Sequence, residues 1–347
     1  MHRFKGKNIS YIFILLILLG GVMLLAASMG AVSIPLTATL RIVASKIFDI
    51  RISLDEGTIN TYETILFKVR FARVVLAVFV GIALSVSGVV YQGIFKNPMA
   101  DPYIIGVSSG AALGATIAAI IFKGLGVLGF SLVPVFAFIG ATTTVFFVYN
   151  LARTGTKVPV ATLLLAGVAI GALLHAATSF VMVFGTKDLH FIIFWLMGGF
   201  SSKNWDHVMV MLPFLVVGLP LIFYFSRDLN LLLLGEERAQ QLGIEAERIK
   251  KILIVVASLL AASAVAVSGI IGFVGLIVPH MVRLVTGPDH RFLIPCSALF
   301  GASFVVFSDL LARTLMAPTE IPLGVITALF GAPFFIYLLK RSKRGLF

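Results

Sequence analysis

Long apolar runs alternate with short polar stretches along almost the whole chain. A helix needs about 20 apolar residues to cross the roughly 30 Å hydrocarbon core of a bilayer. Ten runs approach that length, near residues 9–31, 74–94, 104–122, 130–151, 160–184, 207–226, 251–270, 272–286, 292–312 and 322–339. The eighth is short and contains Pro279. The pattern predicts an all-α polytopic membrane protein with about ten transmembrane helices, and residues 1–347 form a single transmembrane domain.

The composition excludes the class of cytosolic enzymes. Hydrophobic residues make up 59% of the chain and charged residues only 12%, whereas a soluble domain has roughly half and about a quarter. A single cysteine, Cys296, rules out a disulfide framework, and the six histidines lack metal-ligand spacing. We therefore expect no metal site and no cofactor in this chain.

The net charge of +12 would suggest nucleic acid as a partner of a soluble chain, but in a membrane chain it mostly reports basic loops on the cytoplasmic side. Both ends are basic, and an even number of spans returns them to the same side. Threading ten spans from a cytoplasmic start places 17 of the 27 Lys and Arg inside and ten outside. The bias predicts cytoplasmic N- and C-termini and no nucleic-acid partner, with membrane lipid around the helices.

Three external arginines stand out against this rule. Arg70, Arg73 and Arg313 lie at the outer ends of spans, and the nearest acid in sequence is Asp309, one turn before Arg313. They are either anchors that reach the headgroup layer, with Asp309 paired to Arg313, or sites where an acidic partner docks. A guanidinium suits docking because it can meet a carboxylate through two hydrogen bonds.

The longest internal loop, 227–250, is the candidate for a cytoplasmic working part. Residues 234–244 read as a short helix with Glu236 in the first turn and Gly243 positioned for a left-handed cap. Gly235, Ala239 and Leu242 follow a spacing of four and three residues, so they share one narrow face. Such a face suits docking into a groove on another protein. The alternative is a helix lying on the headgroups, which would need a broad apolar face.

Eight sequence blocks occur in an order that is similar to one family of permeases. They are RFAR (70–73), QGIFKNPMADPYIIGVSSGAALG (92–114), LLLAGVAIG (163–171), FWLMGGF (194–200), LGEERAQQLG (234–243), GIIGFVGLIVPHMVR (269–283), GPDHR (287–291) and EIPLGVITALFGAP (320–333). Through them the chain resembles the FecCD family, the permeases of ATP-binding-cassette (ABC) importers for iron chelates, haem and vitamin B12.

The resemblance implies an assembly and a location. Two permease copies form a homodimer with two ABC ATPase subunits, and an extracytoplasmic binding protein delivers the cargo to this permease in the plasma (inner) membrane of a prokaryote. The chain has no G-x-x-x-x-G-K-[ST] loop, so ATP would be bound by the partner ATPase and this chain would not be an enzyme. A ferric siderophore is the first expected cargo, followed by haem or cobalamin.

The resemblance also assigns roles to individual residues. Arg70, Arg73 and Arg313 match positions that dock acidic residues of the binding protein. Gly235, Glu236, Ala239, Leu242 and Gly243 belong to the coupling helix that receives force from the ATPase. Asn97 and Met99, in the turn between the second and third spans, are candidates for a cytoplasmic gate; two prolines in that turn would also explain it as a rigid elbow.

A secondary transporter driven by an ion gradient is the main alternative function. Such proteins keep ionisable groups near the bilayer midplane, where they are costly and serve ion coupling. Of the 15 acidic residues only Asp309 falls within a predicted span, and it lies near the outer end. The chain therefore offers few ionisable residues that could couple transport to an ion gradient.

Overall fold

The fold comes from a computed structural model, which describes residues 2–30, 34–48, 56–122, 126–127, 130–155, 157–185 and 189–342. Five of the basic residues used to orient the chain lie outside the described residues: Arg51, Lys123, Lys187, Lys343 and Arg344.

The described part of the chain is helical apart from one small antiparallel hairpin. Its helices and strands are α1 (His2–Ser28), α2 (Leu36–Phe48), α3 (Glu56–Glu63), the π-helix η1 (Thr64–Arg70), α4 (Phe71–Phe95), the 3₁₀-helix η2 (Pro102–Ile105), α5 (Val107–Ile121), β1 (Gly126–Val127), β2 (Phe130–Ser131), α6 (Leu132–Ala152), α7 (Val160–Gly185), α8 (Leu189–Leu196), α9 (Trp205–Tyr224), α10 (Ser226–Leu233), α11 (Glu236–Gln241), α12 (Ala246–Ser268), α13 (Val274–Thr286), α14 (His290–Thr314) and α15 (Leu323–Ser342).

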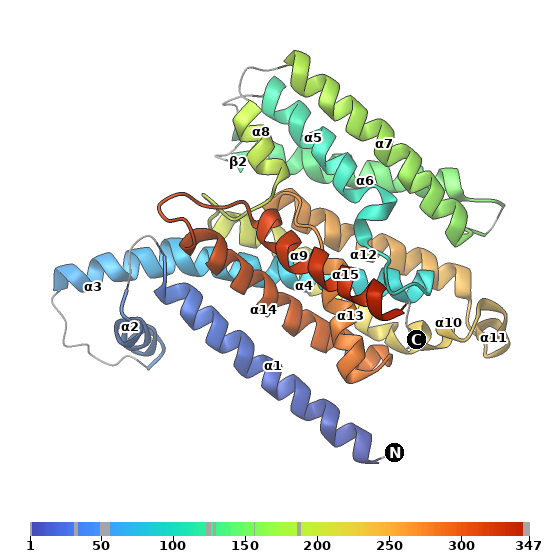
Figure 1. Ribbon diagram of the computed structural model, residues 1–347, viewed down its shortest axis with the longest axis horizontal. Coiled ribbons are helices and arrows are strands. Elements are labelled where there is room, and N and C mark those ends of the chain that lie inside the picture. Colours follow the sequence, from blue (N-terminus) through green and yellow to red (C-terminus); the bar gives the residue numbers. More distant parts are fainter. Residues whose placement is uncertain are drawn as a thin grey trace.

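A helix occupies each of the ten apolar runs. Within the described residues, seven helices are long and apolar enough to cross a membrane, and three shorter apolar helices, α5, α13 and α15, fill the other positions. The all-helical prediction is confirmed, while ten crossings stay a prediction. Figure 1 shows α2 and α3 at one end of the molecule and α10 and α11 at the other. Helix α1 begins, and α15 ends, toward the α11 end, as an even number of crossings requires.

Two connections differ from the sequence-based expectation. The second span does not begin near residue 74, because α3, η1 and α4 continue one another as a helical segment from Glu56 to Phe95. Helix α2 lies in the connection between α1 and this long helical segment. At the other end, the predicted helix over 234–244 is shorter, from Glu236 to Gln241, and a separate helix, α10, precedes it. Gly235 divides them with φ +115°, a conformation that glycine adopts far more readily than other residues.

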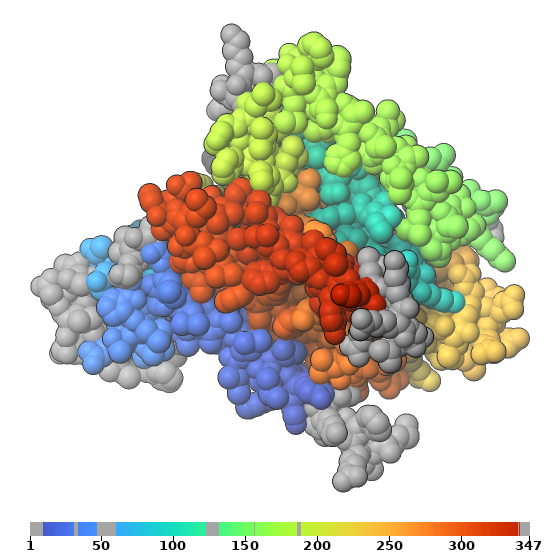
Figure 2. All heavy atoms as spheres, in the orientation of Figure 1, coloured from blue at the N-terminus to red at the C-terminus, as the bar shows by residue number. Residues whose placement is uncertain are grey.

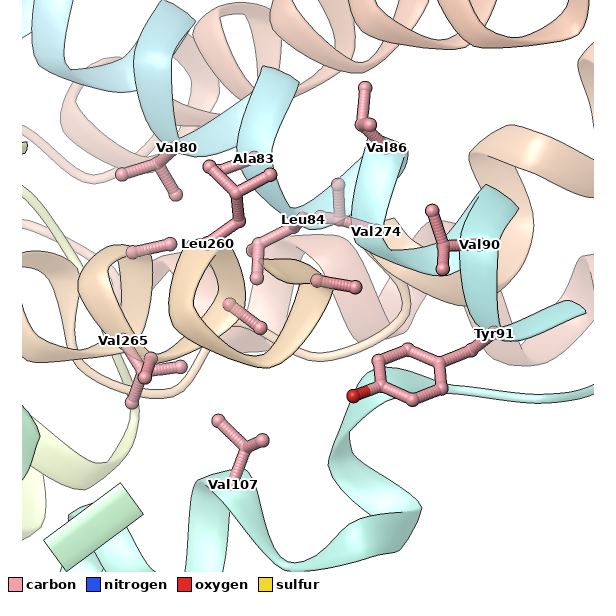
Figure 3. Packing of buried hydrophobic residues seen from close by; sticks show 14 of the residues in the cluster. Val80, Ala83, Leu84, Val86, Val90, Tyr91, Val107, Leu260, Val265 and Val274 are labelled. Carbon is pink, nitrogen blue, oxygen red and sulfur yellow. The ribbon is translucent and has the colours of Figure 1, made fainter. Parts of the chain in front are cut away.

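Helix α4 forms the centre of the bundle and packs against α9, α12, α13 and α14. Figure 3 shows side chains of α4, among them Leu84 and Val90, in the same buried cluster as Leu260 of α12 and Val274 of α13. Buried polar groups on α4 have partners on α12: the Ser87 hydroxyl donates to the Ala257 carbonyl at 2.9 Å, and the Tyr91 and Ser258 hydroxyls lie 2.6 Å apart. Because a polar group without a partner is costly in hydrocarbon, these bonds fix the register of α4 on α12.

Glycines allow the tightest helix contacts. A methyl group at Gly110 on α5 would overlap the carbonyl of Gly140 on α6, and one at Gly88 on α4 would overlap Gly275 on α13. The glycines of α5 therefore serve close packing. Close backbone approach replaces the hydrophobic drive that lipid does not supply.

The periphery contrasts with this centre. Few side chains in the apolar segments of α1 (Ser10–Ser28) and α7 are buried, while α4, α12 and α14 are largely buried. Figure 2 shows α7 along one edge of the molecule and α15 across the front face. Because these exposed faces are apolar, they require lipid or another chain as their surroundings.

Candidate functional site

An ion network lies at the α2 end of the molecule, where α4, α14 and the loop before α15 meet. The Arg73 guanidinium lies 2.8 Å from an Asp309 oxygen and 2.7 Å from a Glu320 oxygen. It donates to both oxygens of each carboxylate. Ser201 donates a further hydrogen bond to Glu320. Arg73 therefore has its donors occupied by the protein itself.

Arg70 and Arg313 bind the end of α1. Arg70 donates to the carbonyls of Ala27 and Ser28 at 2.8 and 2.7 Å, and Arg313 donates to the carbonyl of Ala26. The last carbonyls of a helix lack partners within the helix and carry partial negative charge. The two guanidiniums thus cap α1 and hold it against η1 and α14.

Burial makes this an internal arrangement. Arg70 is 5% exposed and Arg313 is 7% exposed. In this conformation neither presents its guanidinium to a large surface partner. The sequence interpretation had left these three arginines short of acidic or other partners; the fold supplies Glu320 and the α1 carbonyls from distant parts of the chain.

The Glu320 carboxyl is the most accessible acid of this network, with 36% of its side chain exposed. Burial by itself raises the pKa of a carboxyl, but the hydrogen bonds and charge of Arg73 outweigh burial and hold the pKa of Glu320 below its usual value. Glu320 is therefore ionised at neutral pH and remains paired with Arg73.

A cavity of about 930 Å³ lies beside the ion network. Aromatic side chains of α6, α8 and α9 line it, including Phe138, Phe194 and Phe214, and Arg73, Lys203 and Glu320 lie at its polar part. Burial lowers the pKa of Lys203 to about 8. The cavity joins apolar walls to a charged rim.

The α11 end contains a compact helix pair. The α11 helix ends in a turn where the Gly243 N–H donates to the Gln240 carbonyl at 2.9 Å and the Ile244 N–H donates to the Ala239 carbonyl at 3.1 Å. Gly243 has φ +84°, so the predicted left-handed cap is confirmed. Glu236, in the first turn, lies 2.8 Å from the Lys250 ammonium, which also lies 2.6 Å from Glu247 on α12. The Glu236–Lys250 pair ties α11 to α12, and the Glu247–Lys250 pair lies within α12.

The predicted common face of Gly235, Ala239 and Leu242 does not exist on the surface. Ala239 is fully buried, whereas Leu242 is 59% exposed and lies beyond the last helical residue. The six-residue helix ends before Leu242, so the spacing argument for a continuous helix fails. The exposed surface of α11 consists instead of Glu237, Arg238, Gln240 and Gln241, with Leu242 and Gly243 after them.

The turn between α4 and η2 also lies at the α11 end. Asn97 and Met99 are both exposed, and the Met99 N–H donates to the Asn97 side-chain oxygen at 2.9 Å. The Asn97 N–H donates to the Gln92 carbonyl, which closes the end of α4. Burial raises the pKa of the nearby Asp101 carboxyl to about 6, although the Tyr103 N–H bound to it acts in the opposite direction. The turn is thus ordered and presents Met99 outward; its role as a gate stays a prediction.

An apolar groove of about 620 Å³ runs along α15. Its lining comes from the end of α8, the segment before α13 and the exposed side of α15, and includes Met197, Phe273, Val325 and Leu329. Every lining side chain is apolar. A surface of this kind needs a cover in a membrane, either lipid or a second chain.

Sequence reasoning missed several residues of these sites. Glu320 was seen only as part of a motif, because nothing in the sequence joins it to Arg73, 247 positions away. Asn230 and His290 were not singled out, although GPDHR was one of the matching blocks. The signal that could have identified Asn230 and His290 is that both are polar residues near helix ends.

These features match one family over almost the whole chain. The model of the FecCD transport family covers residues 3–341. The chain belongs to the FecCD transport family. The prediction made from the eight blocks is confirmed, and so is a multi-pass membrane protein.

Members of the family share most of the chain's length. This chain is 49% identical over 294 residues to the cobalamin import system permease protein BtuC of Halobacterium salinarum, and the match covers 84% of this chain and 78% of that one. It is 39% identical over 349 residues to the hemin transport system permease protein HmuU of Yersinia pestis, covering 96% of each. A solved structure described as an inward-facing conformation of a metal-chelate type ABC transporter superposes with a TM-score of 0.82 and 32% identity, covering 95% of this chain and 98% of that one.

Proposed function

We propose that this FecCD-family chain is the permease subunit of a binding-protein-dependent ABC importer. Two copies form the pathway for a metal chelate, and a separate ATPase subunit binds and hydrolyses ATP. The α11 end then lies in the cytoplasm and the α2 end faces outward. The same chain performs no chemistry of its own.

The observation that carries this proposal is the α10–α11 helix pair. Its helix α11 is polar and exposed apart from Ala239, lies at the end toward which α1 begins and α15 ends, and is joined to α12 by the Glu236–Lys250 ion pair. A polar cavity of about 590 Å³ lies between α11 and Lys157 of the neighbouring loop. An element that is exposed yet firmly tied to long helices suits a lever that a partner protein moves.

The apolar groove along α15 supports a homodimer. Its lining and much of the α7 surface are apolar and exposed. A second copy seated on this side would enclose the groove and leave a smooth apolar passage. A bulky chelate with its metal already coordinated needs no ligands from such a passage.

The docking role of Arg70, Arg73 and Arg313 remains a prediction, and the geometry defines what docking would require. Direct docking requires each guanidinium to leave internal partners. If the arginines instead shape the surface by holding α1, Arg70→Met lowers the thermal midpoint. Direct docking predicts, in addition to this loss, weaker binding of the external protein at a temperature where the variant is folded. Measuring both quantities separates the two roles, with Lys68→Met as the control because Lys68 is exposed at the same end.

The proposed cargo is a metal chelate, with ferric siderophore first and haem or cobalamin next. The names of the relatives, which include cobalamin and hemin importers, support this class. Vesicles containing the permease, its ATPase and its binding protein test the proposal. ATP-dependent uptake of one of these chelates is the expected result, and uptake driven by a proton gradient without ATP would overturn it.

An ion-coupled transporter is less well supported. The candidate residue, Asp309, has 2% of its side chain exposed and is bound by Arg73, with Arg313 3.7 Å away. A carboxylate held by two guanidiniums is not free to pick up and release a proton or a cation during each cycle.

A further inference from the structure

Two of the family-matching blocks meet in space at the α11 end, and the functions described above do not use their contact. Gly93, in the last turn of α4, belongs to the block 92–114, while Asp289 and His290, at the start of α14, belong to GPDHR. Helix α10 lies between them and contributes Leu229 and Asn230. These five residues are called the α10 joint below.

The Asn230 side chain makes three hydrogen bonds to the start of α14. Its oxygen accepts from the His290 backbone N–H at 2.9 Å and lies 2.8 Å from His290 Nδ1. Its nitrogen donates to Asp289 Oδ1 at 2.7 Å. The same Asp289 oxygen accepts the Arg291 N–H at 3.0 Å and so caps α14. One amide thus links α10 to the helix cap of α14.

These bonds allow only one arrangement of hydrogens. The backbone N–H of His290 needs an acceptor, so the Asn230 oxygen must face it and the Asn230 NH₂ must face the Asp289 carboxylate. His290 Nδ1 is then the donor. His290 is fully buried and, in the part of the chain that the structure describes, its Nε2 has no hydrogen-bond partner. That nitrogen faces Gly93, because a β-carbon at this position would come within 2.8 Å of it.

Gly93 completes the joint by letting α10 and α14 press on α4 together. The same β-carbon would lie 3.2 Å from Leu229 Cδ2, and Leu229 is fully buried. Because protein interiors are close-packed, a displacement of α10 is passed to such a contact rather than absorbed. Gly93 lies one turn before Asn97, and the carbonyls of Gln92 and Gly93 accept hydrogen bonds from Asn97 and Lys96.

We propose that the α10 joint is the mechanical connection between the ATPase-driven helix pair and the turn at residues 96–101, with Asn230 as its positioning residue. This inference rests on the proposed function. When α11 is moved, α10 moves with it, and Asn230 compels the start of α14 and the end of α4 to follow. Without these bonds α10 slides over its neighbours and the turn does not respond.

An isosteric exchange tests the joint. Asn230→Asp places two carboxylates against each other at the 2.7 Å contact and breaks it. Asn150→Asp is the matched control: Asn150 is exposed at the end of α6 and bonds only within its own helix, to the Phe146 carbonyl at 2.8 Å.

The experiment uses vesicles with the permease, ATPase and binding protein, and measures chelate taken up per ATP hydrolysed. Asn230→Asp should lower this ratio at least about fivefold, the scale of a coupling free energy between two sites. Asn230→Ala, which adds no charge, should lower it as well if Asn230→Asp fails to fold. An unchanged ratio in a folded Asn230 variant overturns the joint.

A second readout isolates the connection itself. In a Cys296→Ser background, a Met99→Cys reporter should react with a maleimide at rates that differ between the ATP-bound and nucleotide-free complexes. Asn230→Asp should abolish that difference while the ATPase still co-purifies, and Asn150→Asp should keep it. Retention of the difference in Asn230→Asp overturns the joint. Failure of the wild-type complex to show any ATP-dependent uptake would instead contradict the proposed function.

Discussion

The two ends of the molecule use their charged residues in opposite ways. At the α2 end, Arg70, Arg73 and Arg313 are all engaged with carboxylates or helix carbonyls of the same chain. At the α11 end, the helix α11 carries three charged residues: Glu237 and Arg238 are exposed, and Glu236 is paired with Lys250. The first end is held together by its charges, whereas the second keeps charges available for a partner.

The difference teaches how to interpret charged residues at span ends. Arginine at the end of a span is a candidate for docking only after the free carbonyls of neighbouring helices have been considered, since a helix end presents several of them. Here the last turn of α1 occupies two guanidiniums. The residues that remain exposed, rather than those with an unusual position in sequence, are the better candidates for contact with other proteins.

The largest effect is expected where the α2 end is most closely bound. Arg73→Ala leaves Asp309, with 2% of its side chain exposed, as a buried charge without its main partner. We expect a loss of about 3–5 kcal/mol in the free energy of unfolding, the usual effect of breaking a buried pair. Thermal unfolding in detergent measures it, with Lys68→Ala as the exposed control. A wild-type midpoint for Arg73→Ala would show that this end does not depend on its charges.

Two substitutions compare a buried with an exposed position at the α11 end. Ala239→Glu buries a carboxylate without a partner and should destabilise the protein by roughly 3 kcal/mol. Leu242→Glu changes an exposed side chain, so the unfolding midpoint should stay near wild type while ATPase binding weakens by about 2 kcal/mol. Co-purification of the ATPase and thermal unfolding distinguish the two. Equal effects of both substitutions on unfolding would remove the distinction between buried and exposed positions on α11.

The smallest effect concerns pH at the partly exposed edge of the ion network. The pKa of Glu320 is lowered from its ordinary 4.5 in the folded chain. Its contribution to stability is therefore complete above about pH 4.5 and is lost as pH falls through the lower folded value. The contribution is below about 1 kcal/mol because the carboxyl is partly solvated. The thermal midpoints of wild type and Glu320→Gln should differ near neutral pH and converge in acid; a constant gap would contradict the pairing.

Much of the fold was predictable because each membrane span must carry its own apolar surface. The ten apolar runs are all helices in the structure. The sites were predictable only in part. Gly243 was assigned correctly as a cap because capping is local, whereas Ala239 was placed on the wrong side because the length of α11 depends on Gly235 and on its packing against α12.

The sequence by itself determined the membrane class and the family, since hydropathy and motif order are properties of the chain read in one direction. Only the tertiary structure decided which charged side chains pair with other groups of the same chain. Arg73 meets Glu320, and Asn230 meets Asp289, across separations of 247 and 59 residues. The physical reason is that ionic and hydrogen-bonded partners are the groups that lie close together once the helices have packed. The packing is determined by the shapes of the apolar faces, from which those partners cannot be identified.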